Sequence, residues 1–167
     1  VDNTEYATLQ AAIDAANAGD ILTLLANTTE DVTINKNITL DLGGKTLTNT
    51  NAGKATISVT GGIVTVKNGT VIGGTSYYNI EVTKGSNANL TLEDVTATAG
   101  NTGSSMIDNW GTLTINSGTY TGGLDTVKNE PGAKLTINDG TFELKKGSSD
   151  GFTGVVFNYG NLTITGG

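Results

Sequence analysis

Apolar and polar residues alternate in one short motif that recurs along the chain. The motif is apolar, threonine, apolar, and its copies begin at Ile38, Val64, Leu90, Leu113, Leu135 and Leu162. A period of two sends the apolar side chains of each copy to one side of a strand and the threonine to the other. Each copy therefore predicts a short strand with one buried face.

Each repeat contains two further predicted strands. A turn with glycine follows the motif, and then threonine and an apolar residue, as in Gly69-Thr70-Val71 and Gly118-Thr119-Tyr120. A third segment precedes each motif and places an apolar residue inward, at Ile57, Ile80, Ile107, Val127 and Val156. The copies recur every 22 to 27 residues, which suits one turn of a solenoid. We predict an all-β, right-handed parallel β-helix of about six coils with three strands each.

The N-terminal residues 1–20 predict a capping segment, and residues 21–167 predict the β-helix. The segment contains an amphipathic helix whose apolar stripe is Leu9, Ala12, Ile13 and Ala16. Thr8 is the expected N-cap and Gly19 the expected stop. No such cap follows the last copy of the motif, so we expect the β-helix to continue beyond Gly167, or another chain or domain to contact that open end.

The composition agrees with strands and tight turns and excludes several functions. The chain has 30 Thr, 24 Gly and 18 Asn, residues that suit pleated strands or left-handed turns. Its net charge is -7 without any Arg, which disfavours nucleic acid as a partner. No apolar run is long enough for membrane insertion. Because His and Cys are also absent, we expect neither a metal site nor a cofactor.

Three stretches carry a resemblance to a known group of proteins: 15–21 in the cap, 38–44 in the first full turn and 109–119 in a later turn. On these residues the chain resembles the pectate-lyase-like right-handed β-helices, most of all the repeat domains of bacterial cell-surface adhesins. The resemblance covers nearly the whole chain and implies the fold. The same scaffold carries polysaccharide lyases, glycosidases, adhesins and virus tail spikes, so function depends on a site.

Catalytic groups are sparse. The resemblance implies Arg or Lys as the base of a lyase, but Arg is absent, and the best Lys pair, Lys145-Lys146, lies in a glycine-rich loop expected to be solvated. A glycosidase needs carboxylates that converge on one face. Asp108, Lys128 and Phe157 share one outward position, so a row of carboxylates is interrupted there. We predict no catalytic residues and no turnover.

Two groups of aromatic and acidic residues are the candidate ligand site. An inward position recurs as Asn109, Asn129 and Asn158, which predicts a structural ladder of side-chain amides. The next position faces outward and forms a predicted binding edge of Trp110, Glu130 and Tyr159. Tyr77 and Tyr78, in a longer connection, are the second candidate. Exposed aromatic rings with polar neighbours suit a sugar or a peptide.

Three functional hypotheses follow. The first is a non-enzymatic, extracellular module on a bacterial cell surface, used for adhesion or structural display and bound to a host or cell-surface glycan or protein. The second is a phage fibre or capsid-decoration module on a virion surface. The third is a polysaccharide lyase or glycosidase. A wall anchor in the flanking sequence favours the first, a tail-attachment domain the second, and degradation of an acidic polysaccharide the third.

Overall fold

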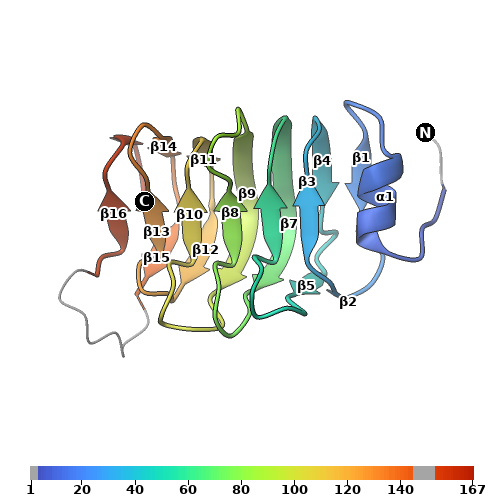
Figure 1. Cartoon of the computed structure of the whole chain (residues 1–167), viewed down its shortest axis with the longest axis horizontal. Helices are drawn as coiled ribbons and strands as arrows, with labels where there is room; N and C mark the ends of the chain where they lie inside the picture. Colours follow the sequence, from blue (N-terminus) through green and yellow to red (C-terminus); the bar gives the residue numbers. More distant parts are fainter. Residues whose placement is uncertain (1–3, 145–152) are drawn as a thin grey trace.

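The chain winds into a parallel β-solenoid, seen from the side in Figure 1. This computed structural model describes residues 4–144 and 153–167. All pairings between the described strands are parallel, and they form one sheet of eleven strands and one of six. The two sheets enclose the apolar side chains, so strands distant in sequence lie side by side along the solenoid axis.

The larger sheet contains the predicted motif and the strand that follows it. Its strands are β1 (Ile21–Thr23), β2 (Thr28–Thr29), β4 (Ile38–Asp41), β5 (Thr46–Thr48), β7 (Ile63–Ile72), β9 (Asn89–Thr98), β11 (Thr112–Ile115), β12 (Gly118–Thr121), β14 (Lys134–Ile137), β15 (Thr141–Glu143) and β17 (Asn161–Ile164). The smaller sheet holds the third strand of each turn: β3 (Val32–Ile34), β6 (Ile57–Val59), β8 (Ile80–Val82), β10 (Ile107–Asn109), β13 (Val127–Asn129) and β16 (Val156–Asn158).

The predicted register is confirmed. Leu113 pairs with Leu90 and with Leu135, and Leu135 pairs with Leu162. The first three of these leucines are buried, because alternate residues of each strand face the solenoid interior. The shared motif therefore fixes which residues stack.

Two details differ from the sequence prediction. The solenoid has about five turns instead of six, because β17, the last copy of the motif, has no second and third strand after it among the described residues. In β7 and β9 the turn after the motif is only a bend within one ten-residue strand. Asn68 and Asp94 make this bend at φ of 58° and 51°, since both residue types tolerate the left-handed region.

The helix α1 (Leu9–Ala15) covers the N-terminal end of the six-stranded sheet (Figure 1). Thr8 is the N-cap as predicted, and its hydroxyl accepts a hydrogen bond from the Ala11 N–H. Leu9 and Ile13 are buried in the core. The predicted stop at Gly19 is wrong: the helix ends at Ala15, and Gly19, with φ of 93°, turns the chain toward β1.

A glutamine side chain closes the outer edge of β3. Val32 and Ile34 bond inward toward β6, so the backbone groups of Thr33 point out of the sheet. The Thr33 N–H donates to Oε1 of Gln10 at 2.8 Å, and Nε2 of Gln10 donates to the Thr33 carbonyl oxygen at 3.1 Å. The Gln10 amide thus takes the place of a neighbouring strand.

The edge of β1 has no such cover in the described part of the chain. Ile21 is 65% exposed, and Leu25, just beyond the strand, is 68% exposed. The cap is therefore confirmed for the six-stranded sheet only. None of the helices found in residues 4–144 and 153–167 is long and apolar enough to cross a membrane.

Inside the solenoid, the predicted amide ladder is present. Nδ2 of Asn109 donates to Oδ1 of Asn129 at 2.8 Å, and Nδ2 of Asn129 donates to Oδ1 of Asn158 at 2.7 Å. Asn109 and Asn129 are fully buried, so their amides are satisfied from one turn to the next. The ladder is structural.

Candidate functional site

The predicted binding edge follows one column of the solenoid. Trp110, Glu130 and Tyr159 each come directly after a strand of the six-stranded sheet. Their backbone N–H groups donate to the preceding turn in the same way, to the carbonyl oxygens of Val82, Asn109 and Asn129. The three residues therefore occupy equivalent positions in successive turns, as the sequence predicted.

Their side chains are not equally accessible. Tyr159 is 58% exposed, and Trp110 is half-buried. Glu130 is only 6% exposed, and its Oε1 forms an ion pair with Nζ of Lys128 at 2.6 Å. The rings of Tyr159 and Trp110 are therefore accessible to a ligand, at least in part, whereas the Glu130 carboxylate is covered and paired with a lysine.

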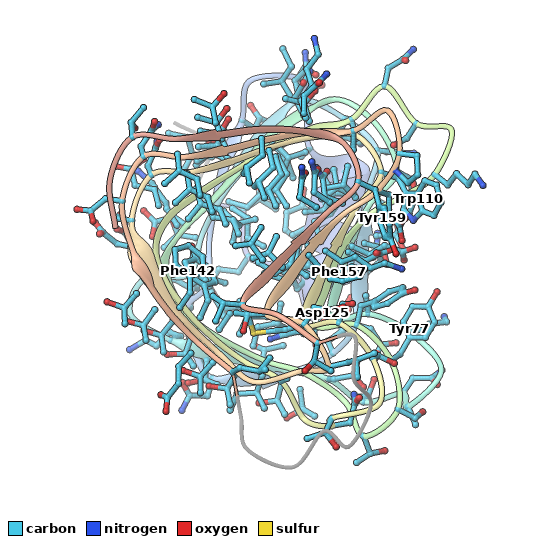
Figure 2. The ribbon with its side chains drawn as sticks, turned by 90° about the vertical axis from the view of Figure 1, so that its left-hand side faces the viewer. Tyr77, Trp110, Asp125, Phe142, Phe157 and Tyr159 are labelled. Carbon is cyan, nitrogen blue, oxygen red and sulfur yellow. The ribbon has the colours of Figure 1, made fainter. Side chains whose placement is uncertain are left out.

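The second candidate pair lies on the same side of the solenoid. Tyr77 and Tyr78 precede β8, and their ring centroids are 4.5 Å apart. Burial, followed by the nearby Asp108 carboxylate, raises the pKa of Tyr78 to about 12. Figure 2, a view along the solenoid, shows Tyr77, Phe157, Trp110 and Tyr159 on one side. We call Tyr77, Tyr78, Trp110, Phe157 and Tyr159 the aromatic face.

Phe157 was not predicted as a site residue, although the sequence analysis placed it outward. It lies on β16, and its ring meets that of Tyr159 edge-on at 4.9 Å between centroids. The contact extends the aromatic face from the corner onto the sheet itself.

The outward column of the six-stranded sheet also contains a carboxylate that sequence reasoning missed. Glu81 on β8 pairs in register with Asp108 on β10, and Asp108 pairs with Lys128 on β13. Neighbouring strands are about 4.8 Å apart, so two carboxylates stand on adjacent turns. The register of Ile80 with Ile107, which the sequence did predict, would have revealed this pair.

Asp108 is the most unusual group of the site. It is 1% exposed; its Oδ2 accepts a hydrogen bond from Nε1 of Trp110 at 2.8 Å, while its Oδ1 has no hydrogen-bond partner among the described residues. Burial raises the pKa of this carboxyl to about 6; Glu130 and Glu81 add to the rise, and the Trp110 bond and Lys128 oppose it. Asp108 therefore holds the indole in place and can keep a proton under mildly acidic conditions.

Two lysine side chains contact residues on the same side of the solenoid. Nζ of Lys84 lies 4.3 Å from the centroid of the Trp110 ring, which is a cation–π distance. Lys128 is paired with Glu130, and this bond raises the pKa of the lysine. Each ammonium group thus contacts a group of the site: that of Lys84 contacts the Trp110 ring, and that of Lys128 contacts the Glu130 carboxylate.

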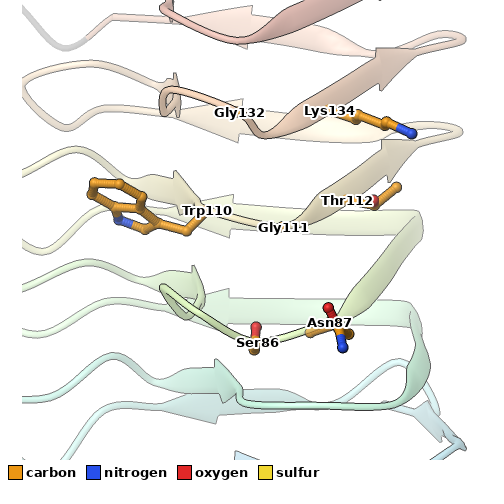
Figure 3. Close-up of a pocket in the computed structure, with 8 residues that line it drawn as sticks. Ser86, Asn87, Trp110, Gly111, Thr112, Gly132 and Lys134 are labelled. Atoms are coloured by element: carbon orange, nitrogen blue, oxygen red, sulfur yellow. The ribbon is translucent and has the colours of Figure 1, made fainter.

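A polar depression of about 250 Å³ adjoins Trp110 (Figure 3). It is lined by Ser86, Asn87, Ala88, Trp110, Gly111, Thr112, Gly132 and Lys134. Hydroxyl, amide and ammonium groups around a shallow hollow suit a ligand rich in hydroxyl groups.

Within 4–144 and 153–167, no three acidic side chains are grouped so that they could hold a metal ion. The lysine pair considered for a lyase, Lys145-Lys146, lies outside the described residues. The acidic residues at the turns instead bind their neighbours: Oγ of Ser117 donates to Oδ1 of Asp94 at 2.7 Å, and the Gly140 N–H donates to Oδ1 of Asp139 at 2.7 Å.

The raised pKa of Asp108 predicts a pH-dependent stability. Between its ordinary pKa of 3.8 and about 6, the folded protein holds a proton that the unfolded chain releases, so this stabilisation is present at low pH and is lost as pH rises through 6. As pH rises from 4 to 7, the free energy of unfolding of the wild type should fall by about 1–3 kcal/mol relative to that of Asp108→Asn, which has no carboxyl group to titrate there. Urea unfolding at several pH values measures this change. A constant difference across that range would contradict the raised pKa.

The chain was compared with protein-family models, curated proteins and solved structures, and no match was found. The β-solenoid fold therefore stands on the structure alone, and neither the pectate-lyase-like group nor the adhesins gain support from a relative.

Proposed function

We propose that the chain is a non-enzymatic binding module that presents the aromatic face to a glycan. One observation carries the proposal: five of the chain's nine aromatic residues gather on one side of a solenoid whose other outward positions are mostly threonine and polar residues. Aromatic rings stack on the apolar faces of sugar rings, and nearby polar groups bind the hydroxyls.

The site favours binding over catalysis. Asp108 is covered and already bound to Trp110, while Glu130 is paired with Lys128, so two of the three nearest carboxylates are engaged within the protein. A general acid has to reach the reacting oxygen directly. Only Glu81 remains half-exposed without a hydrogen bond or ion pair to another described residue.

The biological setting we propose is adhesion or display on a bacterial cell surface, in the manner of the β-helical adhesins that the sequence resembles. A stiff parallel stack without cysteine suits a surface module that holds one face outward. A virion fibre makes the same use of such a stack, and a wall anchor or a tail-attachment domain encoded in the same gene would distinguish the two settings.

The test is the double variant Trp110→Ala with Tyr159→Ala on a glycan array. We expect binding to fall by about tenfold or more, because each ring supplies about 1 kcal/mol of stacking, while the protein stays folded at the assay temperature despite the lost Trp110–Asp108 bond. Tyr6→Ala is the control, since Tyr6 is 45% exposed but belongs to the N-terminal segment. A large loss of stability with unchanged binding would assign both rings to packing and refute the proposal.

A further inference from the structure

The aromatic face is surrounded by more negative than positive groups. Four carboxyl groups stand there, on Glu81, Asp108, Asp125 and Glu130, against the three ammonium groups of Lys84, Lys128 and Lys134. Asp125 is bound by Oγ of Ser105 and by the Gly154 N–H, both at 3.1 Å. The lysines leave the site with an excess of negative charge, which disfavours an anionic sugar such as a uronate.

The chain's own lysines show which kind of group this face attracts. Lys84 places its ammonium group over the Trp110 ring, and Lys128 places its own at Glu130. Lys84 is exposed and lies on the connection after β8, so a ligand can displace it from the ring. An ammonium group on a ligand would find the same indole, with the same quadrupole, once Lys84 has moved.

Asp108 adds a buried acidic group directly beneath the Trp110 indole. Its Oδ1 is buried without a hydrogen-bond donor among the described residues, which is a costly state for a carboxyl oxygen. Glu81 stands on the adjacent turn and is half-exposed. A cation at the surface of these turns would contact the half-exposed Glu81 directly and would interact with the buried Asp108 through its charge alone.

We propose that the aromatic face selects a sugar that carries a protonated amine, such as a glucosamine unit, over neutral and anionic sugars. The ring of the sugar lies on Trp110 or Tyr159, and its ammonium group takes the position near Trp110 and Glu81 from which Lys84 is displaced. The polar depression beside Trp110, with Ser86 and Asn87, receives the hydroxyl groups. This inference rests on the proposed glycan-binding function and specifies its ligand.

The experiment compares three tetrasaccharides by calorimetry near neutral pH, where the Asp108 carboxyl is ionised: the glucosamine tetramer, its fully N-acetylated form and tetragalacturonate. The first two share a backbone and differ in the charge of the amine. We expect the glucosamine tetramer to bind about tenfold more tightly than the N-acetylated one, with tetragalacturonate weakest. The preference should shrink as salt is added, because the attraction is electrostatic.

Charge variants locate the preference. Glu81→Gln should lower the affinity for the glucosamine tetramer by about fivefold and leave the affinity for the N-acetylated tetramer unchanged. Glu93→Gln is the matched control, since Glu93 is exposed on β9 in the other sheet and should change neither. Lys84→Met should strengthen binding of the glucosamine tetramer, because it removes the competing ammonium group.

The outcomes separate the inference from the proposed function. If both amino-sugar tetramers bind equally and both lose affinity in the Trp110 and Tyr159 double variant, the glycan site stands and the amine preference is overturned. If neither tetramer binds, the preference is overturned as well. Binding of oligolysine in place of the sugars would show a peptide site and overturn both.

Discussion

Asn129→Asp is expected to destabilise the protein by about 3–5 kcal/mol at neutral pH. Asn129 is fully buried, and its Nδ2 donates to Oδ1 of Asn158 and to the Asn161 carbonyl oxygen. Aspartate has nearly the same shape but no such hydrogens, so a buried carboxylate would face two acceptors. Urea and thermal unfolding measure the loss.

The control for this variant is Asn138→Asp. Nδ2 of Asn138 also donates to an asparagine of the neighbouring turn, at Oδ1 of Asn116, but Asn138 is exposed and water can replace the bond. We expect a cost of about 0.5–1 kcal/mol there. The loss at position 129 should also diminish at acidic pH, as the new carboxyl gains a proton. Equal costs at both positions would show that the ladder contributes nothing beyond one exposed hydrogen bond.

Gly118→Ala is expected to cost about 3–5 kcal/mol, whereas Gly132→Ala costs about 1 kcal/mol. Both glycines have positive φ, at 121° and 85°. A Cβ on Gly118 would overlap the Val95 carbonyl oxygen of the neighbouring turn, while a Cβ on Gly132 meets nothing within 4 Å. The larger cost at Gly118 therefore combines the close approach of two turns with the greater backbone strain of a methyl-bearing residue at φ of 121°.

Chemical denaturation of the two glycine variants provides the measurement. Since β12 pairs with β9 through Gly118 and Val95, the clash would separate two paired strands. If the two variants lose the same stability, the turns move apart enough to admit a methyl group at position 118, and the predicted clash with Val95 is wrong.

The register of the strands could be predicted because a solenoid repeats one rule in every turn. The repeat that contains Leu113 also contains the inward Asn109, whose amide donates to Asn129 of the next turn, so the two features support the same alignment. The end of α1 was harder to predict, because Nζ of Lys36 binds the Asp14 and Ala16 carbonyl oxygens, and this contact comes from a residue distant in sequence. Capping rules use only the residues next to the helix end, so they cannot predict a contact with Lys36.

The candidate site was predicted in position but not in chemistry. The columns that hold Trp110 and Tyr159 follow from the repeat. The repeat does not predict that Glu130 pairs with Lys128 two residues before it, nor that Asp108, at an outward position of its strand, is buried and bound to Trp110. These contacts determine which carboxyl groups remain free to meet a ligand, and they arise from side chains that differ from one turn to the next.

Because the Gln10 amide covers β3 but not β1, the two sheets differ in whether a strand of another molecule can pair with them at the N-terminal end. A strand from another molecule can join a sheet only where backbone groups point outward unpaired. At β3 the N–H and the carbonyl oxygen of the outward residue Thr33 are both bonded to Gln10, so the six-stranded sheet is closed to addition at this end. At β1 the next outward residues, Ile21 and Thr23, have no paired strand in the described chain. Edge-to-edge aggregation at this end should therefore extend the eleven-stranded sheet alone, and a charged residue in place of Ile21 should suppress it.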